Sequence, residues 1–209
     1  MDRFIRLPGC QKQGMACLDG QVTISARRKG QTARCPACGR RSNSIHSRYQ
    51  RRPTDLAISD LRVVLELEVR RFRCQNQQCS RKTFAEGFPE LVLPHAQRTL
   101  RLAELQTTLA IKTGGEVGSS LLEKLKMPVS GDTLLRLIRN AELPEHVTPK
   151  VLGVDDWSLQ KGKTFGTILV DLEKHQVIDL LEEGTAERLA AWLTTHPGVD
   201  IISRDRSPE

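Results

Sequence analysis

Two pairs of cysteines are the residues best suited to chemistry. Cys35 and Cys38 form a Cys-x2-Cys knuckle followed by Gly39, and Cys74 and Cys79 form a second pair with four residues between them. Four thiolates make a complete tetrahedral ligand set for structural Zn²⁺ and leave no open position for a reacting water. We therefore predict a structural zinc at these four cysteines. Four ordinary buried cysteines are the alternative.

The other thiols and His46 are weaker candidates. His46 lies between the two pairs and is an alternative ligand, although a surface or base-stacking role suits it better when four cysteines are present. Cys10 and Cys17 stand alone as a Cys-x6-Cys pair. We expect both to be free thiols, because the sequence shows no secretory signal and the compartment is therefore reducing.

Basic residues surround both cysteine pairs and include aromatic neighbours. Cationic side chains mixed with aromatic rings on a small rigid fold suit phosphate contacts and base stacking. We predict nucleic-acid binding here, with a merely solvated charged face as the alternative. The candidate DNA-binding residues of this region are Arg40, Arg41, Arg48, Tyr49, Arg70, Arg71 and Arg73.

The elements that position the cysteines are strands. Residues 61–72 alternate apolar and mostly polar side chains, which is the period-two pattern of a half-buried strand. Residues 44–50 predict a shorter strand between the pairs, and residues 22–26 predict one before the first knuckle. Two knuckles joined by strands make a zinc ribbon.

The middle of the chain predicts three helical segments. Apolar residues recur at helical spacing from 97 to 111, again at Val117, Leu121 and Leu125, and from 134 to 141, while Gly114 and Gly115 separate the first two segments. Ser130 is a good N-cap for the third. Two short helices across a tight turn resemble a helix-turn-helix, with a small helical bundle as the alternative. The outward face of the last helix would present Arg136, Arg139 and Asn140 to DNA.

The last third reads as strand, strand, strand, helix, strand. The first strand, 151–154, runs into Asp155, and the fourth, 199–203, runs into Asp205. This order matches the front of a ribonuclease H-like domain, in which these two strands are parallel neighbours and their terminal carboxylates converge on two divalent cations. Hard oxygen ligands favour magnesium or manganese. Two unrelated aspartates at strand ends are the alternative.

Charge is distributed unevenly over the 209 residues. Residues 1–101 hold 20 lysines and arginines against 8 acidic residues, whereas residues 102–209 hold 12 against 17. This difference indicates an anion-binding module joined to something else. No run of eighteen apolar residues occurs, which argues against a membrane span and favours a cytoplasmic protein.

Taken together, these segments resemble the ISL-three family of insertion-sequence transposases, a branch of the DDE transposases. The resemblance covers nearly the whole chain. Its carriers, in chain order, are Cys35-Pro-Ala-Cys38-Gly, His46-Ser-Arg-Tyr49, Arg70-Arg-Phe-Arg-Cys74, Cys79-Ser-Arg-Lys-Thr-Phe84, Val129-Ser-Gly-Asp-Thr-Leu-Leu-Arg136, Gly153-Val-Asp-Asp-Trp157, Lys161-Gly-Lys-Thr-Phe-Gly-Thr167 and Ile202-Ser-Arg-Asp-Arg-Ser207.

The resemblance implies a fold and an activity. It implies an α+β multidomain chain: a β-rich zinc ribbon over 1–94, a helix-turn-helix over 95–143, a linker over 144–150 and the first part of a DDE catalytic domain over 151–209. The zinc ribbon and helices would bind terminal inverted repeats in double-stranded DNA. The implied reaction is metal-dependent phosphodiester cleavage and strand transfer, in the bacterial cytoplasm at the nucleoid.

The resemblance also assigns individual residues. Asp155 matches the first catalytic aspartate, with Asp156 as the alternative, and Asp205 matches the second; both would bind magnesium or manganese. Lys161 and Lys163 would contact the DNA backbone near the scissile phosphate, with exposed turn lysines as the alternative.

The family's third acidic residue, a glutamate on a later helix, has no counterpart in this sequence. Glu209 is only four residues beyond Asp205 and does not match that position. We therefore expect a truncated product that binds DNA, alone or with a full-length transposase, and is inactive by itself. The alternative is a stand-alone zinc-dependent DNA-binding protein or repressor of transposition.

Overall fold

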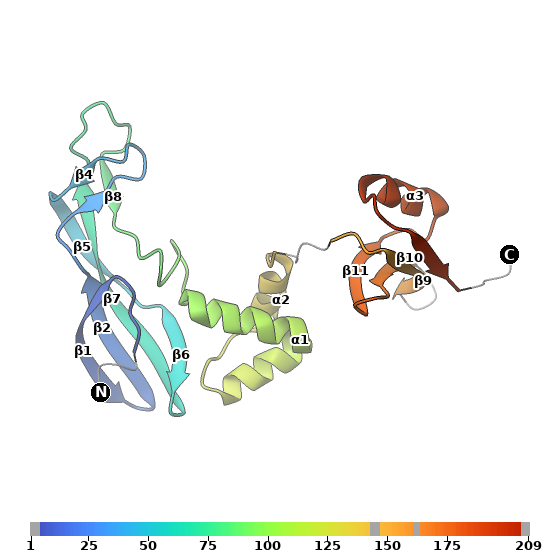
Figure 1. The fold of residues 1–209 in the computed structure, drawn as a ribbon. Coiled ribbons are helices and arrows are strands. Elements are labelled where there is room, and N and C mark those ends of the chain that lie inside the picture. Colours follow the sequence, from blue (N-terminus) through green and yellow to red (C-terminus); the bar gives the residue numbers. More distant parts are fainter. Residues whose placement is uncertain (1–4, 143–146, 161–163, 206–209) are drawn as a thin grey trace. The chain divides into compact units, whose positions relative to one another are not determined.

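The computed structural model describes residues 5–142, 147–160 and 164–205, and the chain divides into two compact units (Figure 1). The first is Met1–Ala141 and the second Glu142–Glu209. The fold is mixed α/β, with a sheet in each unit. No helix among the described residues has both the length and the apolar character needed to cross a bilayer.

The sheet of the first unit is built around one long strand, β7 (Leu61–Arg73). β7 pairs in parallel with β2 (Gln21–Arg28) and antiparallel with β5 (Ile45–Arg51), β6 (Thr54–Ile58) and β8 (Thr83–Ala85). β1 (Cys10–Leu18), which the sequence analysis did not predict, extends the sheet beyond β2. The predicted strands before and between the cysteine pairs are confirmed as β2 and β5.

The apolar positions of β7 form the core of this sheet. Val63, Leu65, Leu67 and Val69 pack with Ile24 of β2 in one buried cluster. The opposite face of β7 is less exposed than simple alternation predicts, because Val64 is 6% and Arg70 9% exposed. β7 is thus covered on both faces over part of its length.

Two helices follow the sheet. α1 (Leu100–Lys124) begins at the N-cap Thr99 and is interrupted at Gly114, whose φ of 74° and ψ of −178° are not helical. The predicted break between two helical segments is therefore confirmed. α2 (Gly131–Arg139) begins at Ser130, whose hydroxyl accepts a hydrogen bond from the backbone N–H of Thr133, as predicted for this cap.

The apolar stripe predicted for the second half of α1 is wrong. Val117, Leu121 and Leu125 are 57%, 38% and 51% exposed. That half instead turns Gly118 and Leu122 inward, together with Gly115. Small residues allow this approach: a Cβ at Gly115 would lie 3.0 Å from the carbonyl oxygen of Gly131, the first residue of α2.

The side chain of Asp55 joins α1 to the sheet. Asp55, on β6, is 3% exposed and accepts hydrogen bonds from the Thr99 hydroxyl at 2.7 Å and from Nε of Arg101 at 2.7 Å. Arg101 also pairs with the second carboxylate oxygen. The charge of a buried carboxylate is tolerated only when it is paired in this way. Sheet and helices therefore belong to one unit.

The second unit contains a four-stranded sheet of order β11-β10-β9-β12. Its strands are β9 (Val151–Gln160), β10 (Thr164–Asp171), β11 (Gln176–Leu181) and β12 (Ile201–Arg204). The predicted parallel pairing of the first and fourth strands is confirmed, with Arg204 of β12 opposite Val154 of β9. α3 (Ala186–Thr195) packs Trp192 against Leu152, Val154 and Leu169 in the core of this unit.

The predicted end of the first strand at Asp155 is wrong. β9 continues to Gln160, because residues beyond Asp155 pair with β10 as far as Gln160 opposite Thr164. Asp155 therefore lies within a strand rather than at its end. Asp205 follows the last residue of β12, as predicted.

Candidate metal centre and nucleic-acid interface

The four cysteines of the predicted zinc site meet in space. Their sulfur atoms all lie within 4.8 Å of one another, although the two pairs are more than thirty residues apart in sequence. The Sγ atoms of Cys35 and Cys79 are 3.9 Å apart and those of Cys38 and Cys74 are 3.6 Å apart. A tetrahedron with metal–sulfur bonds of about 2.3 Å places its sulfurs about 3.8 Å apart. The donor set therefore fits a structural zinc.

Two short hairpins bring the cysteines together. β3 (Ala33–Arg34) and β4 (Arg41–Ser42) pair on either side of the first knuckle, and the backbone N–H of Cys35 donates to the carbonyl of Arg40. The second pair lies in the loop between β7 and β8, where the N–H of Cys74 donates to the carbonyl of Lys82. Stacked rings of Phe72 and Phe84, 5.9 Å apart, belong to the buried cluster beneath both knuckles.

The backbone favours a thiolate at Cys35. Burial raises the pKa of this thiol, but hydrogen bonds from the backbone N–H groups of Cys38 and Ala37, together with those from the thiols of Cys38 and Cys74, lower the pKa to about 7. At Cys74 the backbone N–H of Asn76 lowers the pKa, but burial and hydrogen bonds with the neighbouring thiols raise it to about 11. Without a cation the four thiols cannot all ionise, and a bound Zn²⁺ would remove that conflict.

The remaining cysteines and His46 lie outside the cluster. Among the described residues, Cys35, Cys38, Cys74 and Cys79 form the one group of three or more side chains able to hold a metal ion. The His46 ring is exposed and contacts the Ser47 hydroxyl at 3.1 Å. Cys10 and Cys17 are free, as expected, with Cys10 buried and Cys17 exposed.

Most of the candidate DNA-binding residues near the cysteines lie at the surface. Arg40 and Arg41 are exposed at the first knuckle, and Arg73 is exposed immediately before Cys74. On β5, Arg48 and Tyr49 point to opposite faces of the sheet, as adjacent strand residues must. Arg48 and the nearby Arg27 and Lys29 line a hollow on one face of the sheet. Nε of Arg48 lies 3.6 Å from a carboxylate oxygen of Glu68.

Arg70 differs from the other candidate arginines because its guanidinium is used inside the protein. Its Nε and Nη2 atoms donate to the Glu86 carboxylate at 2.9 and 2.6 Å, and Nη1 donates to the carbonyl of Gly30 at 2.9 Å. The guanidinium also lies 5.4 Å from the ring centre of Phe72. With 9% of its surface exposed, Arg70 has a structural role, and we leave it out of the proposed interface.

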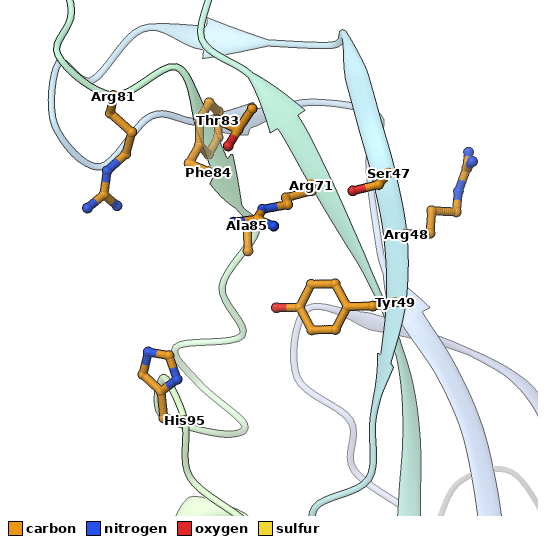
Figure 2. A pocket seen from close by; sticks show the side chains of 9 residues that line it. All are labelled: Ser47, Arg48, Tyr49, Arg71, Arg81, Thr83, Phe84, Ala85 and His95. Atoms are coloured by element: carbon orange, nitrogen blue, oxygen red, sulfur yellow. The ribbon is translucent and has the colours of Figure 1, made fainter.

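A hollow opens on the face of the sheet to which Tyr49 points (Figure 2). Arg71 of β7, Arg81 of the loop after Cys79 and His95 line it together with Tyr49, and Arg48 is also among its lining residues although its side chain points away in Figure 2. Arg81 belongs to the segment from Cys79 to Phe84 that carries the family resemblance, whereas His95 was not among the predicted residues. His95 is distant in sequence and carries no pattern of its own; its φ of 60° becomes visible only in the structure.

The candidate DNA-contacting face of the helices lies on α2. Arg136, Arg139 and Asn140 are exposed, and Nη2 of Arg136 donates to the Thr133 hydroxyl at 3.0 Å. Leu134, fully buried, anchors the opposite side of α2 against Leu102 and Leu122 of α1. The C-terminal end of α2 is thus cationic and faces solvent, whereas the apolar side of the helix packs against α1.

The two candidate catalytic aspartates follow the last paired residues of two parallel strands. The pairing of β9 with β12 ends at Val154 and Arg204, and Asp155 and Asp205 are the next residues along each chain segment. Both are exposed, and Asp155 accepts a hydrogen bond from the backbone N–H of Asp156 at 2.8 Å. No third metal-binding group joins them among the described residues. Lys161, Lys163 and Glu209 lie outside the described residues.

Comparisons with known proteins agree with the cysteine geometry. Residues 31–79 match the family described as the zinc-finger of transposase IS204/IS1001/IS1096/IS1165. The chain is also 27% identical over 149 residues to the transposase for insertion sequence element IS1001 of Bordetella parapertussis.

That match covers 69% of this chain and 34% of the relative, so the chain corresponds to about a third of the relative's length. No solved structure matches the chain significantly. The matched segment contains all four clustered cysteines. The chain is therefore similar, over residues 31–79, to the zinc finger of these insertion-sequence transposases.

Proposed function

We propose that this chain binds the terminal inverted repeats of an insertion sequence in double-stranded DNA. One observation carries the proposal: a four-cysteine cluster, within the segment matched by the transposase zinc finger, is bordered by exposed arginines. A structural zinc would hold the two knuckles rigid, so that these arginines face the phosphates in a fixed arrangement.

Two elements divide the work of recognition in this proposal. Arg40, Arg41, Arg48, Arg71 and Arg73 make contacts that are mainly to phosphates, which give affinity but carry no sequence information. α2 acts as the recognition helix of a helix-turn-helix. Arg136 and Arg139 can pair with guanine and Asn140 with adenine in the major groove.

The experiment is a mobility shift with the full chain and a duplex carrying the inverted repeat that flanks its gene. We expect a shift that is stronger than with a scrambled duplex of equal composition. Extraction of zinc by a chelator should abolish the shift, and added Zn²⁺ should restore it. Undiminished binding after complete zinc removal would refute the role of zinc, and equal binding to the scrambled duplex would refute repeat recognition.

We further propose that the second unit is part of a ribonuclease H-like DDE domain. The support is the parallel pairing of β9 and β12 up to Val154 and Arg204, the residues that directly precede Asp155 and Asp205. A pair of Mg²⁺ or Mn²⁺ ions would supply activation of the attacking oxygen and stabilisation of the leaving oxygen at the phosphate. The two aspartates would hold these cations, while the zinc unit positions the end of the element. Transposition would then proceed in a homo-oligomer or with a full-length transposase.

A second candidate function is a DNA-binding repressor of transposition. It needs only the four-cysteine cluster and the exposed arginines beside it, which all lie in the first unit. Incubation of the full chain with repeat DNA and Mn²⁺ separates the two functions. Nicking or strand transfer that is lost in the Asp155→Asn variant would establish an enzyme. Binding without any cleavage, together with inhibition of a full-length transposase, would establish the repressor.

A further inference from the structure

The hollow beside Tyr49 has the dimensions of a ligand site. Its volume is about 690 Å³, within the range of about 300–1,000 Å³ typical of small-molecule sites. An adjoining hollow of similar volume shares Tyr49, Arg81 and His95 with it and extends to Arg34 beside the first knuckle. The two hollows share these lining residues, and we refer to them together as the depression.

An exposed aromatic ring projects into this depression. Tyr49 is the single tyrosine of the chain, is 44% exposed, and points toward Arg71 and His95 (Figure 2). A tyrosine at such a site offers a flat apolar face for stacking. Arg48, the preceding residue, points to the other side of the strand.

The side chains around Tyr49 are positively charged and free to bind an anion. Arg71 and Arg81 are exposed, and neither guanidinium has an ion-pair or hydrogen-bond partner among the described residues. The one carboxylate that lines the adjoining hollow is Glu86, and it is fully paired with Arg70. An anionic group entering the depression therefore meets two free guanidinium groups without a competing acid.

We propose that this depression binds an unpaired nucleotide of DNA, with its base stacked on Tyr49 and its flanking phosphates on Arg71 and Arg81. The inference rests on the proposed function, that the chain binds DNA. A base inside a duplex has both faces covered by its neighbours, so a recessed tyrosine ring can stack only on a base that has left the helix. A frayed or single-stranded end of the element supplies such a base.

The test uses the full chain and a DNA single strand of about ten nucleotides carrying one 2-aminopurine. Stacking on Tyr49 should change the fluorescence of this base on binding. Tyr49→Ala should weaken single-strand binding about 5- to 150-fold, since stacking on an aromatic side chain contributes about 1–3 kcal/mol per base. Tyr49→Phe, which keeps the ring, should bind close to wild type. Binding of the blunt inverted-repeat duplex should be nearly unchanged by either variant.

The matched controls are two exposed arginines at opposite ends of β7. Arg71→Ala, beside Tyr49, should lower single-strand affinity, whereas Arg62→Ala, which lines neither hollow, should leave the fluorescence change intact. Zinc content and the thermal unfolding midpoint establish that each variant is folded. If Tyr49→Ala does not fold, Tyr49→Phe decides the test, because a loss of single-strand binding in that variant would contradict stacking by the ring.

Two outcomes overturn the inference. One is an equal loss of single-strand and duplex binding in Tyr49→Ala; the other is single-strand binding that does not depend on Tyr49. Absence of duplex binding by the wild-type chain would instead overturn the proposed function, so the two failures are distinguishable.

Discussion

Adjacent residues on β7 show how strand alternation separates stability from recognition. Arg70 and Arg71 are consecutive and chemically identical, yet Arg70 is buried in an ion pair with Glu86 whereas Arg71 is exposed at the hollow. Composition and spacing cannot separate the two, since both lie in one basic run beside Cys74. The partner of Arg70 comes from a loop sixteen residues later, a contact that the sequence pattern does not encode.

The Arg70–Glu86 pair makes the first testable prediction. Arg70→Met should lower the free energy of unfolding by about 3–5 kcal/mol, because it leaves a fully buried carboxylate without its counter-charge. Arg71→Met is the matched control and should change stability little. Urea unfolding of the two variants and of Arg70→Met/Glu86→Leu measures this, and the double variant should recover much of the loss. Equal stability of both single variants would contradict a structural role for Arg70.

Cys10 gives the pH-dependent prediction. Burial raises the pKa of this thiol from 9.0 to about 11, against a partly compensating attraction from Arg28. Because the folded pKa is above the unfolded value, the contribution to stability is fully present below pH 9 and is lost as the pH rises through 11. The loss should reach about 2–3 kcal/mol, at about 1.4 kcal/mol per pKa unit.

Unfolding free energies measured from pH 8 to 11 test this prediction, with Cys10→Ala as the comparison. The variant should show a flatter decline than the wild type over that interval. Parallel curves for the two proteins would show that another group causes the alkaline loss.

At the scale of the element, the hydrophobic period of the strands and the N-cap of a helix were predictable, but the packing partners of helices and strands were not. The alternation of residues 61–72 gave β7, and Ser130 gave the start of α2. The burial of Leu122 in place of Leu121 was missed because Gly115 and Gly118 occupy the packed face. Glycine adds nothing to an apolar count, yet it lets two helices approach closely. The strand β9 was predicted to end before Asp155 and Asp156 because acidic residues are rare in strands. In the structure β9 continues through them and pairs antiparallel with β10.

The two leucines of α1 test that reading of the packed face. Leu122→Ala should cost about 2–5 kcal/mol of stability, since Leu122 is fully buried between α1 and α2. Leu121→Ala, one residue away and 38% exposed, should cost much less. Thermal and urea unfolding of both variants measure the difference. A larger cost for Leu121 would restore the stripe expected from the sequence.

At the scale of the whole molecule, the sequence predicted the metal site better than the surface around it. Cysteines at this spacing can bind a metal ion in few arrangements, so the spacing of Cys35, Cys38, Cys74 and Cys79 was enough to predict the four-cysteine cluster. The hollow beside Tyr49 did not, because His95 and Arg81 reach it through the loop after β8 and the second knuckle. The charge difference between the two parts of the chain nevertheless places the cationic surface in the first unit, where the zinc-binding strands lie.

That charge distribution predicts how DNA binding depends on salt. The logarithm of the affinity for duplex DNA should fall linearly with the logarithm of the salt concentration, with a slope of about −0.9 for each phosphate contacted. Arg40→Ala, beside the first knuckle, should reduce the magnitude of that slope by about one. Arg188→Ala is the matched control, because Arg188 lies in the second unit and is paired with Glu183 at 3.1 Å. Mobility shifts at several salt concentrations give the slopes. If Arg188→Ala reduced the slope and Arg40→Ala did not, the second unit rather than the zinc-binding unit would carry the phosphate contacts.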